Sequence, residues 1–166
     1  MLAVRLRLAL FEPDRPHSLG MALRLGACLG VGVDVVEPCG FPLDDRRIRF
    51  GALDYLARAD WARHVGLAAF RAFLAREQRR LVLLSTRAGL PYHRLEFRAD
   101  DVLMLGREGS GAPDEVHDLA DRRVRVPMRD GLRSLNLVTA GAVVLGEALR
   151  QTGGLDALAG AGAGEA

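Results

Sequence analysis

Two loops carry the residue types from which a ligand pocket can be built. In residues 124–136 a short β-branched pattern breaks at Pro127, a loop containing Gly131 follows, and Ser134-Leu135-Asn136 opens a long apolar helix. A loop that leads into a helix N-terminus presents backbone N–H groups and small polar side chains to a ligand. Residues 106–113 form a second loop of the same character. Because each loop follows a strand-like segment, we predict that both line one pocket.

Several common catalytic motifs do not fit this chain. The 106–111 loop lacks the Lys-Ser/Thr pair of a P-loop, which argues against nucleoside triphosphate hydrolysis. The glycines of residues 26–32 follow a predicted helix, whereas a dinucleotide-binding turn follows a strand. Ser134 has no nucleophile-elbow glycines around it, so a hydrolase triad is unsupported. No metal site is expected, because no ligand spacing relates the four histidines, His17, His64, His93 and His117.

The basic residues of the chain are all arginine, 23 in number, with no lysine. GC-rich coding explains this without any function, whereas arginine also binds phosphates bidentately and stacks on bases. The net charge of +2 is too small to indicate nucleic-acid binding by itself. Three local clusters favour an RNA-binding function more than the net charge does: Arg46-Arg47-Ile48-Arg49, Arg76 with Arg79-Arg80, and Arg122-Arg123-Val124-Arg125.

Length and composition indicate one soluble domain. The chain has 166 residues, of which 49% are hydrophobic and 27% charged, enough to bury a core. Arg5, Arg7 and Glu12 interrupt the N-terminal apolar pattern, so we expect neither a signal peptide nor a membrane span, and we expect a cytoplasmic protein. Cys28 and Cys39 are outside any C-x-x-C spacing and are expected to be reduced, buried small hydrophobes.

The hydrophobic pattern alternates between strands and helices. Strands are predicted over residues 2–11, 33–37, 61–65, 81–85, 102–105 and 124–126. Helices are predicted from His17 or Ser18 to about Leu29, and over residues 46–53, 66–80, 114–119 and 136–150. The continuous apolar runs at 81–85 and 102–105 are typical of parallel strands buried on both faces. We therefore predict an α/β domain over residues 1–152, with a largely parallel sheet and helices on both faces, and a loose Gly/Ala-rich tail over 153–166.

Three blocks of the chain together resemble a known family. The first runs from Leu10-Phe11-Glu12-Pro13 through residues 16–25 to Val36-Glu37-Pro38-Cys39-Gly40-Phe41 and Leu53-Asp54-Tyr55. The second is residues 105–111, and the third covers 125–128, 133–137 and 147–151. The chain is similar to SPOUT-superfamily RNA 2′-O-ribose methyltransferases, and most similar to the minimal tRNA (cytidine/uridine-34) 2′-O-methyltransferases.

The resemblance implies a C-terminal trefoil knot, an obligate homodimer, S-adenosylmethionine as cofactor and tRNA as substrate. The catalytic residues that it implies are Arg24, Glu108 and Asn136. The residues that it implies for the cofactor are Leu105, Gly106, Val126, Met128, Ser134 and Leu135. Those expected to contact RNA are Ser18, Arg24, Arg46 and Arg47.

The chain departs from the family pattern at two positions. Ser18 and Met21 stand where the family usually has asparagines, which bears on the RNA side of the pocket more than on the cofactor side. Two alternatives to wobble-ribose methylation follow: methylation of a ribose elsewhere in tRNA or rRNA, and a catalytically weak RNA-binding dimer of the same fold. Retention of Arg24, Glu108, Ser134 and Asn136 favours the enzyme.

Overall fold

The computed structural model describes residues 5–44 and 46–162. Within them, a seven-stranded sheet has the order β3-β2-β1-β6-β4-β7-β5, and every adjacent pair is parallel. The strands are β1 (Arg7–Phe11), β2 (Gly32–Val36), β3 (Trp61–His64), β4 (Arg80–Leu84), β5 (Leu90–Pro91), β6 (Asp101–Leu105) and β7 (Arg122–Arg125). The helices are α1 (Pro16–Leu29), α2 (Arg46–Ala52), α3 (Leu67–Arg76), α4 (Asp114–Leu119), α5 (Leu137–Gln151) and α6 (Gly154–Gly162), with 3-10 turns η1 (Leu53–Arg58) and η2 (Tyr92–Arg94). The predicted α/β fold with a parallel sheet is confirmed.

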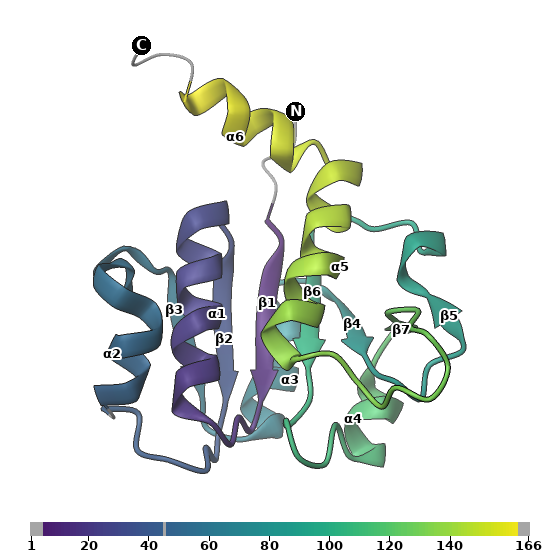
Figure 1. Cartoon of the computed structure of the whole chain (residues 1–166), viewed down its shortest axis with the longest axis horizontal. Helices are drawn as coiled ribbons and strands as arrows, with labels where there is room; N and C mark the ends of the chain where they lie inside the picture. The colour runs from purple at the N-terminus through teal and green to yellow at the C-terminus, as the bar shows by residue number, and fades with distance from the viewer. Residues whose placement is uncertain (1–4, 45, 163–166) are drawn as a thin grey trace.

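Helices cover both faces of the sheet, as predicted (Figure 1). Alternate residues of each central strand contribute to two separate apolar clusters. Leu8 and Leu103 pack with α1, α2 and α5, whereas Ala9 and Met104 pack with α3 and α4. These strand residues are all fully buried, which explains why their segments read as continuous apolar runs.

The strand order determines where a ligand can bind. β1 lies between β2 and β6, and β4 and β7 follow β6 in the sheet. Because the strands are parallel, the segments after β1, β6, β4 and β7 all emerge at the same edge of the sheet, the lower edge in Figure 1. In open α/β sheets, ligands bind at this carboxyl edge, near the point where the chain reverses its winding direction.

Several element boundaries differ from the prediction. α1 begins at Pro16 with Arg15 as its N-cap, because a proline at the first helical position has the required φ, and Ser18 is therefore a buried residue of the first turn. α3 ends at Arg76, and Gln78, with φ of 51°, makes the turn into β4. β7 begins at Arg122, earlier than predicted, and β5, η1 and η2 were not anticipated by the pattern. Positions 2–4 of the predicted first strand lie outside the described residues.

The C-terminal segment and the cysteines also differ from expectation. The composition predicts a loose tail after residue 152, but the structure has helix α6 there, separated from α5 by a turn at Gly153 with φ of 76°. The alanines and leucines of α6 favour a helix more strongly than its glycines oppose one. Residues 163–166 of the predicted tail lie outside the described part of the chain. Cys28 and Cys39 are both free thiols, but Cys28 is exposed and Cys39 half-buried, so the prediction that they are buried is wrong.

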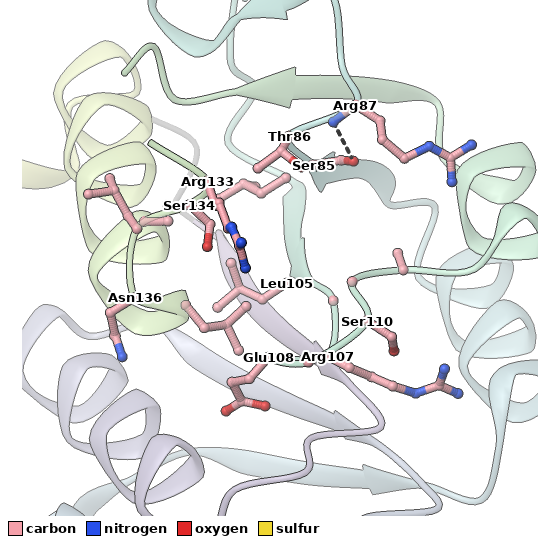
Figure 2. Close-up of a pocket in the computed structure, with 18 of the residues that line it drawn as sticks. Ser85, Thr86, Arg87, Leu105, Arg107, Glu108, Ser110, Arg133, Ser134 and Asn136 are labelled. Carbon is pink, nitrogen blue, oxygen red and sulfur yellow. Dashed lines mark hydrogen bonds between the residues drawn. The ribbon is translucent and has the colours of Figure 1, made fainter. Parts of the chain in front are cut away.

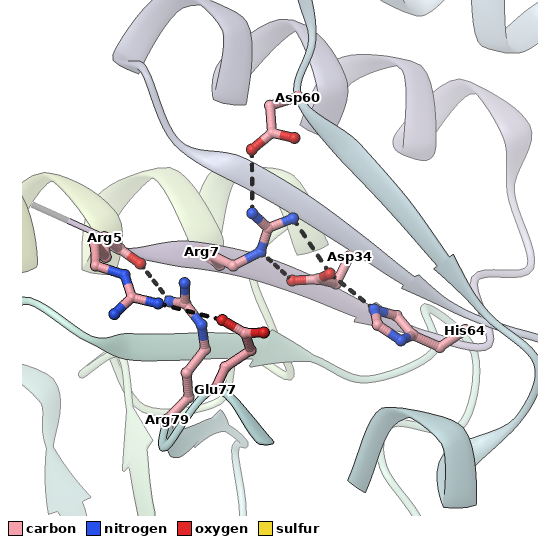
Figure 3. Close-up of polar contacts among 7 residues, drawn as sticks. All are labelled: Arg5, Arg7, Asp34, Asp60, His64, Glu77 and Arg79. Atoms are coloured by element: carbon pink, nitrogen blue, oxygen red, sulfur yellow. Dashed lines mark hydrogen bonds and ion pairs between the residues drawn. The ribbon is translucent and has the colours of Figure 1, made fainter. Parts of the chain in front are cut away.

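A buried polar network joins the first three strands (Figure 3). The fully buried carboxylate of Asp34 on β2 accepts hydrogen bonds from Arg7 Nε at 2.6 Å and Arg7 Nη2 at 3.3 Å. Asp34 Oδ1 also lies 2.8 Å from His64 Nε2 on β3. A buried charge is tolerated where it is paired and hydrogen-bonded in this way. None of these side chains lines the cavity described below, so we assign the network to the scaffold.

Candidate active site

A cavity of about 700 Å³ opens at the carboxyl edge of the sheet. Three loops form its walls: residues 84–87 after β4, 105–112 after β6, and 126–137 between β7 and α5. Figure 2 shows these loops facing one another, with Ser85 and Thr86 on one side, Ser134 and Asn136 on another, and Glu108 on a third. The two loops that the sequence predicts to share a pocket therefore do so.

The structure brings together most of the predicted site residues. All six positions expected at the cofactor line the cavity, as do Glu108 and Asn136. Leu105 is buried at the end of β6, and Val126 and Leu137 add apolar surface to the same cavity. Ser18, Arg24, Arg46 and Arg47 do not line it. The predicted cofactor positions thus cluster in one chain, whereas the predicted RNA positions lie elsewhere on it.

The loop after β6 is a closed turn. The backbone N–H of Arg107 donates to the Gly111 carbonyl at 3.2 Å, and that of Gly111 donates to the Arg107 carbonyl at 3.0 Å. A Cβ at Gly106 would lie 2.6 Å from the backbone nitrogen of Ala112, so only glycine fits this position. Arg107 forms an ion pair with Glu12, which follows β1, and its side chain points away from Ser134 in Figure 2.

Asp14 and Glu108 form a hydrogen-bonded pair of acidic residues beside the cavity. Asp14 accepts the backbone N–H groups of Glu108 and Gly109, each at 3.3 Å. Hydrogen bonding to Glu108 and to these N–H groups lowers the pKa of Asp14. Burial, and then hydrogen bonding to Asp14, raises the pKa of Glu108, while the Ser18 hydroxyl acts in the opposite direction. Among the described residues, Glu108 Oε1 is a buried oxygen whose hydrogen-bonding capacity is not satisfied.

Asn136 is the N-cap of α5, as the sequence indicates. Its Oδ1 accepts the backbone N–H groups of Val138 at 3.1 Å and Thr139 at 3.2 Å. The cap fixes the start of α5, and with it the position of Ser134 and Leu135 in the cavity wall. The amide nitrogen of Asn136 is not used by the cap and remains a potential donor.

Arg24 lies on the exposed side of α1, outside the cavity. Its guanidinium carbon is 5.5 Å from the centroid of the Tyr55 ring on η1, a cation–π contact that orients the side chain. Arg46 and Arg47 are exposed on α2, whereas Ser18 is buried near Glu108. Within one chain, Arg24 and the cofactor positions therefore do not meet in a single cavity.

Several residues of the site were not predicted from the sequence. Ser85, Thr86 and Arg87 line the cavity from the loop after β4, and Arg15 and Arg133 add two guanidiniums. The signal was present in residues 85–89, where small polar residues and a glycine follow a buried strand. Asp14 had no local signal, because its partner Glu108 is 94 positions away.

The described residues contain no group of three or more His, Cys, Asp and Glu side chains arranged to hold a metal ion. Among their helices, none combines the length and the apolarity required to cross a bilayer.

A sequence profile described as the SpoU rRNA Methylase family matches residues 5–146, which include every strand and every loop of the cavity. The chain belongs to this family.

Relatives of this SpoU-family chain align with nearly its whole length. A tRNA (cytidine(34)-2′-O)-methyltransferase of Beijerinckia indica is 53% identical over 148 residues, which is 89% of this chain and 92% of the relative. A protein of the same description from Escherichia coli K12 is 37% identical over 151 residues, covering 89% and 94% of the two chains. The resemblance identified from the three sequence blocks is confirmed.

Solved structures share the fold. One concerned with the 2-OH methylation of C/U34 on tRNA is 34% identical, with a TM-score of 0.84, and covers 89% of this chain and 95% of its own. The SpoU methyltransferase AviRb from Streptomyces viridochromogenes, in complex with AdoMet, also has a TM-score of 0.84 but is 21% identical. Its match covers 91% of this chain and 62% of AviRb. It therefore supports the fold alone.

Proposed function

We propose that the protein transfers the methyl group of S-adenosylmethionine to the ribose 2′-hydroxyl of nucleotide 34 of tRNA. The observation that carries the proposal is the cavity at the carboxyl edge of the sheet, where all the predicted cofactor positions meet Glu108 and Asn136. The relatives that align with nearly the whole chain are tRNA (cytidine(34)-2′-O)-methyltransferases, which favours this ribose over other sites in tRNA or rRNA.

The cavity suits a cofactor with both apolar and polar parts. Its volume of about 700 Å³ lies within the usual range for small-molecule sites, roughly 300–1,000 Å³. Leu105, Val126 and Leu135 offer apolar surface, while Ser134 and the backbone of the glycine-containing loops offer hydrogen bonds. Bound S-adenosylmethionine supplies an electrophilic methyl group. We assign its binding to Leu105, Gly106, Val126, Met128, Ser134 and Leu135.

The chain's own residues would act mainly by positioning the ribose. Glu108 Oε1 is an unpartnered acceptor, and the Asn136 amide is an uncommitted donor. Together they can orient a hydroxyl for in-line attack, which accounts for much of the rate in reactions that create little charge. Because its pKa is raised, Glu108 binds a proton more readily than an exposed glutamate, and it is therefore a candidate to hold the proton that the hydroxyl loses.

A second copy of the chain would complete the site. Helices α1 and α5 lie side by side (Figure 1), and both expose apolar side chains, Met21 at 37% and Val143 at 38%. Leu135, at the cavity, is 40% exposed. We propose that a homodimer covers this face and that Arg24 of each copy reaches the cavity of the other. Light scattering is then expected to report twice the chain mass of 18.0 kDa.

We propose that the chain forms a trefoil knot, in which the segment 126–136 and α5 pass through a loop of the preceding chain. The match of residues 5–146 to the SpoU rRNA Methylase family supports this. We place the enzyme in the cytoplasm, where tRNA is modified.

Mapping of 2′-O-methyl groups in tRNA from cells with and without the protein tests the proposal. A methyl group at nucleotide 34 should disappear when the gene is deleted and return with the wild-type protein. A methyl group lost at another ribose would redirect the assignment to that site. An unchanged methylation map, together with tRNA binding by the purified protein, would favour the RNA-binding dimer instead.

A further inference from the structure

A second cavity, of about 390 Å³, lies beside the first. Residues 87–89, between β4 and β5, and residues 121–123, at the start of β7, form most of its wall. β5 pairs only with Val124 and Arg125, so the sheet edge at Arg122 and Arg123 is left uncovered and the cavity opens there. Arg87 and His117 line both cavities. The second cavity therefore adjoins the proposed active site.

The wall of this cavity is electropositive. Arg87, Arg122 and Arg123 contribute three guanidiniums, and Asp121 is the only carboxylate among its lining residues. Asp121 Oδ2 is already bonded to the backbone N–H of Leu81 at 2.7 Å. Burial, and then the charges of Arg87 and Arg123, lower the pKa of His117, although Asp114 and Asp118 oppose this effect. An anion bound in this cavity would therefore offset the positive charge that acts on His117.

Two of these guanidiniums are held by backbone carbonyl groups. Arg122 Nη1 donates to the carbonyl of Asp121 at 2.8 Å. Arg123 Nη1 donates to the carbonyl of His117 at 2.9 Å and to that of Ala120 at 3.5 Å, both at the end of α4. Within residues 5–44 and 46–162, Nε and Nη2 of Arg123 donate no hydrogen bond. Arg87 is held less firmly, by an exposed ion pair with Asp114 at 2.9 Å. An anchored guanidinium with free N–H groups binds phosphate oxygens with little loss of conformational entropy.

We propose that this cavity is a binding site for a phosphodiester group of the substrate RNA, held by Arg87, Arg122 and Arg123. The inference rests on the proposed function, since it gives the RNA a second point of attachment beside the cofactor cavity. In Figure 2 the guanidinium of Arg87 points away from Leu105 and Ser134, and Arg87 also lines the second cavity. The site gives a role to Arg122 and Arg123, two of the three arginines in the cluster at residues 122–125.

Salt titrations of tRNA binding provide the main test. The Arg122→Ala and Arg123→Ala variants should each weaken binding of a total tRNA pool and reduce the slope of log affinity against log salt by about one. Asp114→Asn should strengthen binding, because it releases Arg87 from a competing carboxylate. Arg71→Ala, on the exposed side of α3, is the matched control and should leave the slope unchanged. Thermal melting identifies any variant that is merely unfolded, and Arg122→Ala spares the contacts of Arg123 with α4.

Inorganic phosphate provides a second probe that does not depend on activity. In NMR titrations of the wild-type protein, phosphate should raise the pKa of His117, because the anion offsets the repulsion from Arg87 and Arg123. Unchanged salt slopes in both alanine variants would overturn the proposal, even if phosphate shifts His117. Reduced slopes in a protein that methylates no tRNA would uphold the phosphate site while the proposed methyltransferase function fails.

Discussion

Asp14 and Glu108 bond to each other reciprocally. The backbone N–H of Glu108 donates to Asp14 Oδ1 at 3.3 Å, and the backbone N–H of Asp14 donates to Glu108 Oε2 at 3.4 Å. This pair joins the turn after β1 to the loop after β6, at the edge of the proposed active site. The two carboxyl groups also differ in acidity, because the pKa of Asp14 is lowered and that of Glu108 is raised.

The Asp14→Asn substitution should lower the pKa of Glu108, although burial, the larger cause of its rise, remains. With a raised pKa, Glu108 becomes a carboxylate only at a higher pH than usual, so any acid limb of methyl transfer that depends on this carboxylate should move to lower pH in the variant. Carbon-13 NMR of the glutamate carboxyls measures the shift, and Glu108→Gln identifies the signal. An unchanged pKa of Glu108 in Asp14→Asn would show that Asp14 does not contribute to its rise.

Gly106→Ala should abolish cofactor binding, because its new Cβ would meet the backbone of Ala112 and Gly111 at 2.6–2.7 Å and displace the loop. Gly109→Ala, in the same loop, is the control: its Cβ would meet only Asp14 Oδ2, at 3.4 Å, and binding should change little. Calorimetry with S-adenosylhomocysteine measures both. Equal affinities in the two variants would contradict the assignment of this loop to the cofactor.

The structural features that could be predicted from the sequence are those that depend on residues close together in the chain. The runs 81–85 and 102–105 predict strands buried on both faces, and Asn136 ahead of an apolar segment predicts the cap of α5. Each inference depends on residues close in sequence. For the same reason the pocket between two loops was predictable, since each loop follows a recognisable strand.

Long-range pairing of polar groups was not predictable. Arg7, Asp34 and His64 belong to three different strands, and only the strand register brings them together. Asp34 does interrupt the apolar residues of β2, which indicates a buried polar group, but it does not name the partners. The Gly/Ala-rich composition of residues 153–166 predicts a loose tail, whereas residues 154–162 form helix α6, to which alanine and leucine contribute helix propensity.

Cys39 should resist alkylation, in contrast to an exposed thiol. Burial, followed by the charge of Glu37, raises its pKa to about 11, so the reactive thiolate is scarce below that pH. In a Cys28→Ser variant, iodoacetamide labelling should be very slow at pH 8 and should accelerate as the pH approaches 11. Mass spectrometry after timed quenching measures the rate, with the same variant in denaturant as the control. Rapid labelling of the folded variant at pH 8 would contradict the raised pKa of this thiol.

Two substitutions of Asn136 can separate its capping role from its proposed catalytic role. Asn136→Ala removes the acceptor for two backbone N–H groups and should destabilise the protein by about 0.5–2 kcal/mol. Asn136→Asp keeps an acceptor oxygen and should retain most of that stability, yet it lacks the amide donor and should lose methyl transfer. Denaturant unfolding and single-turnover methylation are measured on both variants. Full activity in Asn136→Asp would restrict this residue to capping.

Arg24 provides the sharpest test of a site shared between subunits. Arg24→Ala should strongly reduce methyl transfer while leaving cofactor affinity unchanged, because the guanidinium is assigned to the RNA and not to the cofactor. Arg24→Lys should restore activity only in part, since an ammonium cannot make a planar bidentate contact with phosphate. Arg71→Ala, also an exposed arginine, should behave as the wild type.

Mixed dimers then decide which copy supplies the arginine. Refolding Arg24→Ala with Gly106→Ala in equal amounts makes half of the dimers mixed, and in each mixed dimer one site pairs an intact cofactor loop with the partner's intact Arg24. Activity should therefore return to about a quarter of the wild-type value, as expected for an isologous dimer. If each site used the arginine of its own chain, every site in the mixture would carry one defect and no activity would return. Wild-type turnover by Arg24→Ala alone would remove Arg24 from the mechanism.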